Sequence, residues 1–419
     1  MTTEQYDIVI VGGGLVGLSL ALAIGQGPHK ALKVAVVEPY PLNGGEVLNP
    51  SFDARSTALS YSTERIYRQM DIWQELSPAS SPIRQIHVSE KGRWGGTRLE
   101  AKAQNLDCYG HVVPNEVLGK VLFKVFKQQL AAGRSELLAP MSVAEISPEI
   151  GGYKLRLTGV GSQSDGQADR WLQSHLVVLA DGGRSGLAHQ LGFHYQEFDY
   201  QQHALIANVA MSKPHDGIAY ERFTGDGAMA LLPLTNHGAD ARAALVWTVP
   251  SRQSQGLMEI SSDEFLRRLQ DVFGYRTGRF VKVGERVSYP LRLQAATEQY
   301  RPGLVLLGNA AHTLHPVAGQ GYNLALRDAM ALAECLKSAT TPEHLGSAEV
   351  LARYVEMQKS DQHRTIIGSD GLLKVFGSKL GAVRQARQIG LVGLNLLAPI
   401  KNQFAQVAMG AGGIARDWR

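Results

Sequence analysis

Residues 306–329, LLGNAAHTLHPVAGQGYNLALRDA, hold the densest group of side chains that could do chemistry. His312 and His315 lie three positions apart, and a Gly-Gln-Gly sequence follows Pro316. Two imidazoles at this spacing could bind zinc, but no nearby Cys, Glu or His has a usable spacing to complete the ligand set. We therefore expect no metal site. We interpret the histidines as structural groups that hydrogen-bond backbone in a turn, and proton transfer remains the alternative.

A glycine cluster near the start of the chain predicts a dinucleotide site. Gly12, Gly14 and Gly17 follow the pattern G-x-G-x-x-G directly after the apolar run 6–11. The first glycine permits a tight turn, the second lets the backbone approach a pyrophosphate, and the third lets the helix pack closely on the strand. The phosphates would bind unpaired N–H groups at the helix N-terminus. Glu38 ends the next apolar strand, where its carboxylate would accept hydrogen bonds from the adenosine ribose and repel the 2′-phosphate of NADP.

The elements that must position these residues alternate between strands and helices. Apolar strand patterns appear at 6–11, 33–38, 174–180 and 303–308, and helical apolar spacing appears at 115–132 and after 332. From about 195 to 290, short strand patterns are separated by Gly, Asp, Asn and Pro turns. We therefore expect an α/β fold in which a Rossmann-like nucleotide-binding domain is interrupted by a β-rich domain and followed by a helical C-terminal region.

Composition narrows the class of protein. The 419 residues include 42 basic and 38 acidic side chains, and the net charge of +4 is too weak to indicate nucleic-acid binding. Two cysteines cannot form a disulfide framework and fit a reducing compartment. We find no pattern of a signal peptide and no apolar run of the ~18–20 residues that a membrane-spanning helix needs. We therefore expect a cytoplasmic protein.

Four motifs carry a resemblance to a known family: FDARSTALS, LADGGRS, YERFTGDGAMALLPL and GNAAHTLHPVAGQGYNLALRD. Together with the first glycine cluster, they resemble the FAD-dependent aromatic hydroxylases of the para-hydroxybenzoate hydroxylase type, and within them the ubiquinone-biosynthesis branch. The resemblance covers nearly the whole chain. It implies an FAD-binding domain at 1–80, 105–190 and 296–340, a β-rich substrate domain at 81–104 and 191–295, and a C-terminal helical region at 341–419.

The resemblance also implies roles for single residues. Arg55 would lie near the flavin and its phosphates, and Asp181 would serve both FAD and a transient NAD(P)H. Asn309 would meet the ribityl chain, at a position where most of the wider family has Asp. The turn from Pro316 to Asn323 would run along the pyrimidine edge of the isoalloxazine, with Pro316, Gly319, Gln320 and Gly321 beside the ring. A helix N-terminus there would stabilise the negative charge of reduced flavin.

By the same resemblance, the protein hydroxylates a polyprenylated phenol, 2-polyprenyl-6-methoxyphenol, with NAD(P)H and O2 and through a flavin C4a-hydroperoxide. Two alternatives stay open: a flavin dehydrogenase or reductase acting on another substrate, and a non-catalytic FAD-binding scaffold in a ubiquinone-biosynthesis complex. No residue is identified as the base that deprotonates the phenol.

Two groups of apolar residues allow more than one interpretation. The aromatic residues Tyr220, Phe223, Trp247 and Tyr289 could line a substrate pocket, although core packing is the more common role of aromatics in strands. The apolar stretch 378–413, with basic flanks, could cover the protein's own core or bind a partner subunit. It could also make peripheral contact with the inner membrane.

Overall fold

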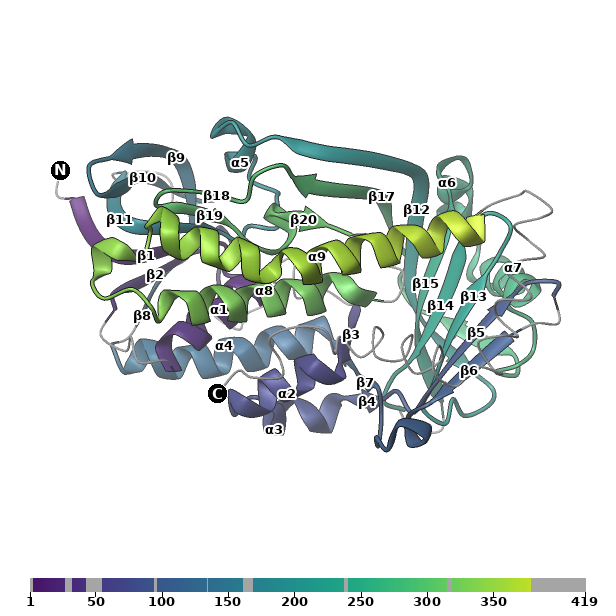
Figure 1. The fold of residues 1–419 in the computed structure, drawn as a ribbon. Helices are drawn as coiled ribbons and strands as arrows, with labels where there is room; N and C mark the ends of the chain where they lie inside the picture. The colour runs from purple at the N-terminus through teal and green to yellow at the C-terminus, as the bar shows by residue number, and fades with distance from the viewer. Residues whose placement is uncertain are drawn as a thin grey trace.

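The computed structural model describes residues 3–26, 32–42, 55–93, 96–133, 135–160, 169–236, 240–314 and 319–377. Within these residues, two large sheets lie at opposite ends of an elongated molecule (Figure 1), and long helices cover the first of them. A three-stranded sheet lies between the two. The predicted α/β class is confirmed.

The first sheet has the order β18-β19-β11-β1-β2-β8, with β10 and β9 added beside β11. Its strands are β1 (Thr3–Val11), β2 (Val34–Val37), β8 (Ser135–Leu138), β9 (Met141–Glu149), β10 (Gly152–Gly159), β11 (Arg170–Leu179), β18 (Tyr300–Arg301) and β19 (Leu304–Leu306). The pairs β2–β8, β1–β2, β1–β11 and β11–β19 are parallel. The carboxyl ends of β1, β2, β11 and β19 therefore meet at one edge, where open α/β sheets bind ligands.

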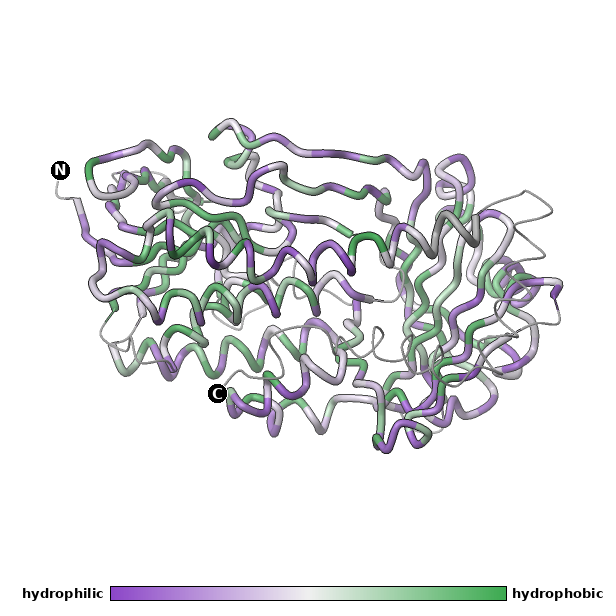
Figure 2. Tube along the Cα trace, in the orientation of Figure 1, coloured by the Kyte–Doolittle hydropathy of each residue, from purple (hydrophilic) through white to green (hydrophobic). Residues whose placement is uncertain are grey.

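Helices from both ends of the chain cover this sheet. They are α1 (Leu15–Gln26), α4 (Asn115–Ala131), α8 (Gln320–Leu336) and α9 (Ala348–Gly377). Ten of the twelve residues of α1 are buried, because α4 and α8 both pack against it. A helix buried in this way is apolar on nearly all sides. Figure 2 shows many hydrophobic residues along the strands and helices of this part of the molecule, with hydrophilic residues along α9. Cys335 is buried in the same core, as a packing residue rather than a reactive thiol.

The second sheet has the order β20-β17-β12-β15-β14-β13-β5-β6, with β16 beside β12. Its strands are β5 (Gln85–Glu90), β6 (Gly96–Glu100), β12 (Tyr195–Met211), β13 (Ile218–Phe223), β14 (Ala228–Pro233), β15 (Ala241–Pro250), β16 (Phe280–Val283), β17 (Val287–Ala296) and β20 (His312–Thr313). Its outer face packs on α6 (Ser251–Glu259) and α7 (Ser262–Phe273), with Trp247 and Phe265 in edge contact. Phe223 and Trp247 are buried side chains, as core packing predicts.

The small sheet joins the two large ones. It consists of β3 (Ser56–Ser60), β4 (Ser81–Pro82) and β7 (Gly110–Pro114). The helices α2 (Tyr61–Gln69) and α3 (Trp73–Leu76) follow β3, and the short helix α5 (Leu187–Gln190) follows β11. Because β3 begins directly after Arg55, this small sheet fixes where the predicted flavin-contacting arginine lies.

None of the described helices has both the length and the hydropathy that crossing a membrane requires. The apolar stretch 378–413, on which the expected membrane or subunit contact depended, lies outside the described residues.

Candidate functional site

The glycine loop between β1 and α1 accepts only glycine at two positions. Gly12 has a φ of +110°, and a Cβ there would lie 2.6 Å from the carbonyl oxygen of Ala180. A Cβ on Gly17 would lie 1.9 Å from the carbonyl oxygen of Gly12. Gly14 comes immediately before α1, and its carbonyl oxygen accepts a hydrogen bond from Leu18 N at 3.0 Å. The close contacts keep the N-terminus of α1 against the edge of the sheet, so its N–H groups lie where a pyrophosphate would bind.

Glu38 lies at the end of β2, beside the glycine loop. The residue is only 3% exposed. Its carboxylate accepts hydrogen bonds from Gly13 N at 2.6 Å and Tyr40 N at 3.1 Å. The acidic group predicted for the ribose is therefore held against the loop that would bind the adjoining pyrophosphate.

The loop after β11 wraps around Asp181. Its carboxylate accepts hydrogen bonds from Gly183 N at 3.0 Å, Ser185 N at 3.1 Å and the Ser185 hydroxyl. Gly182 and Gly183 both have a φ near +70°, so the loop turns sharply at this point. A Cβ on Gly183 would lie 3.2 Å from the carbonyl oxygen of Asn309, so this loop lies against the one that follows β19.

The loop after β19 lies against the start of α1. Gly308 has a φ of +62°, and a Cβ there would lie 3.4 Å from Val16 Cγ1. Asn309 is exposed, and its carbonyl accepts a hydrogen bond from Thr313 Oγ1 at 3.3 Å. Segments of the chain near residues 12–17, 180–183 and 308–309 therefore converge at one edge of the sheet.

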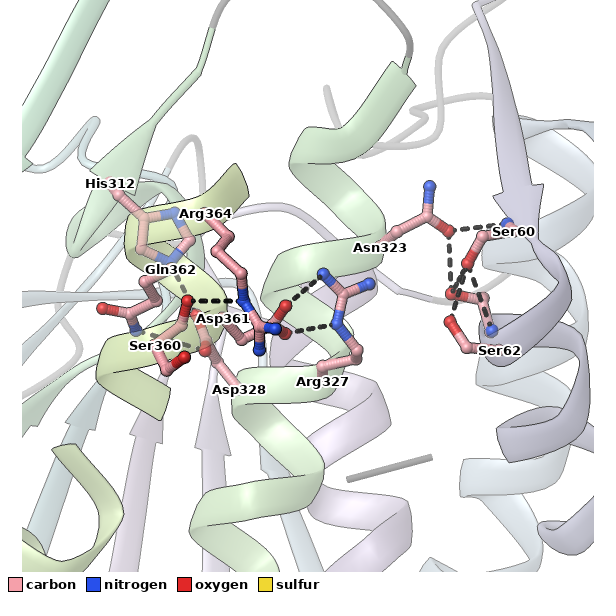
Figure 3. A network of polar contacts seen from close by, with 11 residues as sticks. Ser60, Ser62, His312, Asn323, Arg327, Asp328, Ser360, Asp361, Gln362 and Arg364 are labelled. Carbon is pink, nitrogen blue, oxygen red and sulfur yellow. Dashed lines mark hydrogen bonds and ion pairs between the residues drawn. The ribbon is translucent and has the colours of Figure 1, made fainter. Parts of the chain in front are cut away.

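Asn323 connects the late glycine turn to the early part of the chain. Its Oδ1 accepts hydrogen bonds from Ser60 N at 2.8 Å and Thr63 Oγ1 at 2.7 Å (Figure 3). Its Nδ2 donates to the carbonyls of Ala58 at 2.8 Å and Gly319 at 2.9 Å. Asn323 was predicted to contact the cofactor; in this structure its side chain joins the first turn of α8 to β3 and α2.

The N-terminus of α8 supplies the other residues predicted beside the flavin ring. Gly319 is the N-cap with a φ of +61°, and Gln320 and Gly321 begin the helix. A Cβ on Gly321 would meet no atom within 4 Å. Pro316 and His315, which were predicted to belong to the same turn, lie outside the described residues.

Arg55 lies between the small sheet and the second large sheet. Its guanidinium lies 4.9 Å from the centre of the Tyr289 ring on β17. Its carbonyl accepts a hydrogen bond from Asn115 N at 2.9 Å, at the start of α4. Of the four aromatic residues proposed for a pocket, Tyr289 therefore pairs with a predicted cofactor residue, whereas Tyr220 packs edge-on against Phe273.

His312 contacts a buried carboxylate rather than the backbone partner that we expected. Its Nε2 lies 2.5 Å from Asp328 Oδ2, and the two side chains are at most 2% exposed (Figure 3). Gln362 Nε2 on α9 donates to the other oxygen of Asp328 at 3.1 Å. The residue before Asp328, Arg327, pairs with Asp361 of α9 at 2.6 Å. No local pattern in the sequence predicts these partners, because 16 and 34 positions separate them.

Sequence reasoning also missed a cluster of Glu64, Cys108 and His111. Their ligand atoms lie within 4.8 Å of one another, and His111 Nδ1 lies 3.1 Å from Glu64. Burial opposes protonation of the imidazole, but hydrogen bonds to Cys108 and Glu64 raise the pKa of His111 to about 9. Arg68 also pairs with Glu64 at 2.7 Å, so the carboxylate is neutralised by protein groups. Only the C-x-x-H spacing of Cys108 and His111 was visible in the sequence.

Comparisons with known proteins cover nearly the whole chain. A family model described as FAD binding domain matches residues 5–363. Ubiquinone hydroxylase UbiL of Rhodospirillum rubrum is 33% identical over 411 residues, covering 96% of this chain and 89% of that protein. 3-Demethoxyubiquinol 3-hydroxylase of Escherichia coli is 28% identical and covers 98% of this chain and 100% of its own length. The crystal structure of p-nitrophenol 4-monooxygenase PnpA from Pseudomonas putida has the same fold, with a TM-score of 0.75, 18% identity, and coverage of 99% of this chain and 100% of that one.

Proposed function

The chain belongs to the FAD-binding-domain family of flavoprotein monooxygenases, and we propose that it hydroxylates the aromatic ring of a polyprenylated phenol in ubiquinone biosynthesis. The names of the relatives from Rhodospirillum rubrum and Escherichia coli support this class of substrate. Our choice within the class is 2-polyprenyl-6-methoxyphenol, which rests on the motifs of the late glycine turn.

The residues at the sheet edge fit an FAD molecule. The glycine loop leaves no room for a Cβ at Gly12 or Gly17, so backbone N–H groups can approach a pyrophosphate. In our proposal Glu38 binds the adenosine ribose, and Arg55, Asp181 and Asn309 bind the central part of the cofactor. Bound FAD would supply the chemistry that activates O2.

The chain's own residues orient the cofactor and the substrate. The N-terminus of α8, from Gly319 to Gly321, would place a partial positive charge beside the pyrimidine edge of the ring, where reduced flavin is negative. The hydrogen bonds that Asn323 accepts from Ser60 and Thr63 hold this end of the helix in place. No second dinucleotide motif occurs in the sequence, so NAD(P)H would bind only transiently. In our proposal it binds near the Asp181 loop.

One observation supports the proposal most strongly: the loop after β19 lies against the helix that follows the early glycine loop, and the start of α8 lies against the small sheet that follows Arg55. Gly308 packs on Val16 of α1, and Gly319 packs on Ala58 of β3. Segments 292 and 261 positions apart in the chain can therefore bind a single elongated cofactor.

The proposal is tested with FAD-loaded protein, NADH or NADPH, 18O2 and 2-farnesyl-6-methoxyphenol as the probe. We expect one 18O atom in the ring-hydroxylated product by mass spectrometry, and NAD(P)H oxidation that depends on the phenol. Oxidation of NAD(P)H without 18O in any product would indicate a dehydrogenase or reductase. Protein that retains FAD but accepts no electrons from either donor would indicate a scaffold.

A further inference from the structure

One row of residues on the inner face of the second large sheet is less buried than the matching residues of its outer face. On the outer face, Leu205, Leu231 and Leu245 are at most 1% exposed because α6 and α7 cover them. On the inner face, Ile206, Ala230 and Val246 are only half-buried. Figure 1 shows the same arrangement, with α7 beyond the sheet on one side and α8 on the other. The inner face is therefore the one that looks toward the proposed cofactor site.

Glu221 of β13 lies on this inner face. Its partner on β14 is Ala230. Ala230 pairs with Val246 of β15, and Val246 pairs with Ile206 of β12. Directly opposite residues of neighbouring strands project from the same face of a sheet. Glu221 is therefore the acidic member of a row whose next three positions are aliphatic.

The neighbouring row on this face is covered by the segment that follows Arg55. Two residues along from Glu221 and Val246, Ala219 and Ala244 belong to a buried cluster against which Ala58 packs. Ala58 also accepts the hydrogen bond from Asn323 and lies 3.3 Å from where a Cβ on Gly319 would be. The half-buried row thus lies next to the N-terminus of α8.

We propose that Glu221 accepts the hydrogen bond of the substrate's phenolic hydroxyl and takes its proton before the ring is oxygenated. This inference rests on the proposed function. The phenol O–H bond breaks, an O–H bond forms on the carboxylate, and the electron pair stays on the phenolate oxygen. The phenolate is more electron-rich than the phenol, which favours attack by an electrophilic oxygen. The proton returns to the oxygen once the ring has been hydroxylated.

The surroundings of Glu221 suit this role. No hydrogen bond or ion pair to its carboxylate occurs among the described residues, although an unpaired carboxylate among apolar side chains is costly. Burial raises the pKa of Glu221 to about 8, with no contribution from a neighbouring charge. A general base is most effective when its pKa lies near the working pH.

Other titratable side chains on this face include Arg55, Glu90, Tyr61, Tyr109 and Tyr289. Burial raises the pKa of Tyr109 to about 12. Glu90 of β5 is a second buried carboxylate, two residues along from the Val88 that pairs with Glu221. A pH dependence between 7 and 9 is therefore assigned to Glu221 by its loss in Glu221→Gln.

The test compares wild type with Glu221→Gln, Glu221→Asp and the control Glu285→Gln, which changes an exposed glutamate outside the site in the same way. Each protein is loaded with FAD, and its FAD content is measured. The ultraviolet difference spectrum of bound 2-farnesyl-6-methoxyphenol then reports phenolate formation from pH 6 to 9.5 without turnover. Product formation from 18O2 gives kcat and KM over the same range.

We expect wild type and Glu285→Gln to form phenolate, and kcat to rise with pH, both with a midpoint near 8. Glu221→Gln should lose the phenolate signal and the pH dependence, with kcat about 10²–10⁴-fold lower and a much smaller change in KM. Glu221→Asp should restore part of the signal. Wild-type behaviour of Glu221→Gln would overturn the inference, as would a phenol spectrum in wild-type protein that shows no phenolate.

Two further outcomes separate the inference from the proposed function. A Glu221-dependent phenolate signal without labelled product would refute the hydroxylase function and keep the role of Glu221 in phenol binding. If Glu221→Gln fails to retain FAD, the test relies on Glu221→Asp. A phenolate midpoint in Glu221→Asp identical to that of wild type would contradict the proposal.

Discussion

Replacing Asn323 with alanine removes four hydrogen bonds: three join α8 to β3 and α2, and the fourth is to Gly319 at the N-cap of α8. Asn323 is 1% exposed, so water cannot replace the lost partners. Each buried hydrogen bond contributes roughly 0.5–1.5 kcal/mol, and the loss should therefore be roughly 2–6 kcal/mol. For a chain of 419 residues, this corresponds to a fall of roughly 2–6 °C in melting temperature.

The same change should weaken FAD binding. Without Asn323, the N-terminal turn of α8 is no longer held to the segment that follows Arg55, so both must be ordered when FAD binds. We expect the Kd for FAD to rise at least about tenfold, which corresponds to ~1.4 kcal/mol. The assays are thermal unfolding of the apoprotein and quenching of FAD fluorescence on titration with apoprotein.

Two further variants separate hydrogen bonding from general damage. Asn323→Asp keeps the two accepted bonds but turns a charge toward the carbonyls of Ala58 and Gly319, so it should be at least as harmful as alanine. Asn236→Ala changes an exposed asparagine and should behave like wild type. If Asn323→Ala matched Asn236→Ala in both melting temperature and Kd, the proposed connection between the two parts of the site would be wrong.

Three other predictions concern single contacts. Gly17→Ala forces a Cβ to 1.9 Å from a backbone oxygen, so about 1–3 kcal/mol of stability and most FAD content should be lost; normal flavin absorbance of the purified variant would refute this. The pKa of His111 is raised to about 9 in the folded protein, above the ordinary value of 6.5. Protonated His111 therefore stabilises the fold fully below about pH 6.5, and this stabilisation is lost as the pH rises through 9. His111→Gln should therefore flatten the wild-type fall in melting temperature across this range, and an unchanged slope would contradict it. Asp328→Asn removes the charge beside His312, so thermal unfolding should show a loss of about 2–4 kcal/mol, whereas exposed Asp263→Asn, in the first turn of α7, should lose no more than about 1 kcal/mol.

The sequence predicted well those parts of the fold that depend on local pattern. A G-x-G-x-x-G sequence between an apolar strand and a helix has few structural solutions, and Gly12 and Gly17 lie as that pattern requires. Glu38 followed from its place at the end of the second strand. Parallel pairing then brings the strand ends to one edge without further information.

Contacts between distant segments could not be predicted in the same way. His312 and Asp328 meet because β20 and α8 pack together, and nothing in either segment specifies the other. Glu221 was part of a quoted motif, yet only the register with Ala230 and Val246 reveals which face it occupies. A one-residue shift of that strand would place it on the opposite face.

The ion pair between Arg327 and Asp361 sets the longitudinal position of α9 on α8. Arg327 is 1% exposed, so sliding α9 by one helical turn would leave a guanidinium without its counter-charge in the interior. Such a shift costs far more free energy than a shift between two purely aliphatic helices, because there one leucine contact can replace another. The pair therefore fixes the position of α9, which ends at Gly377, relative to the N-terminus of α8.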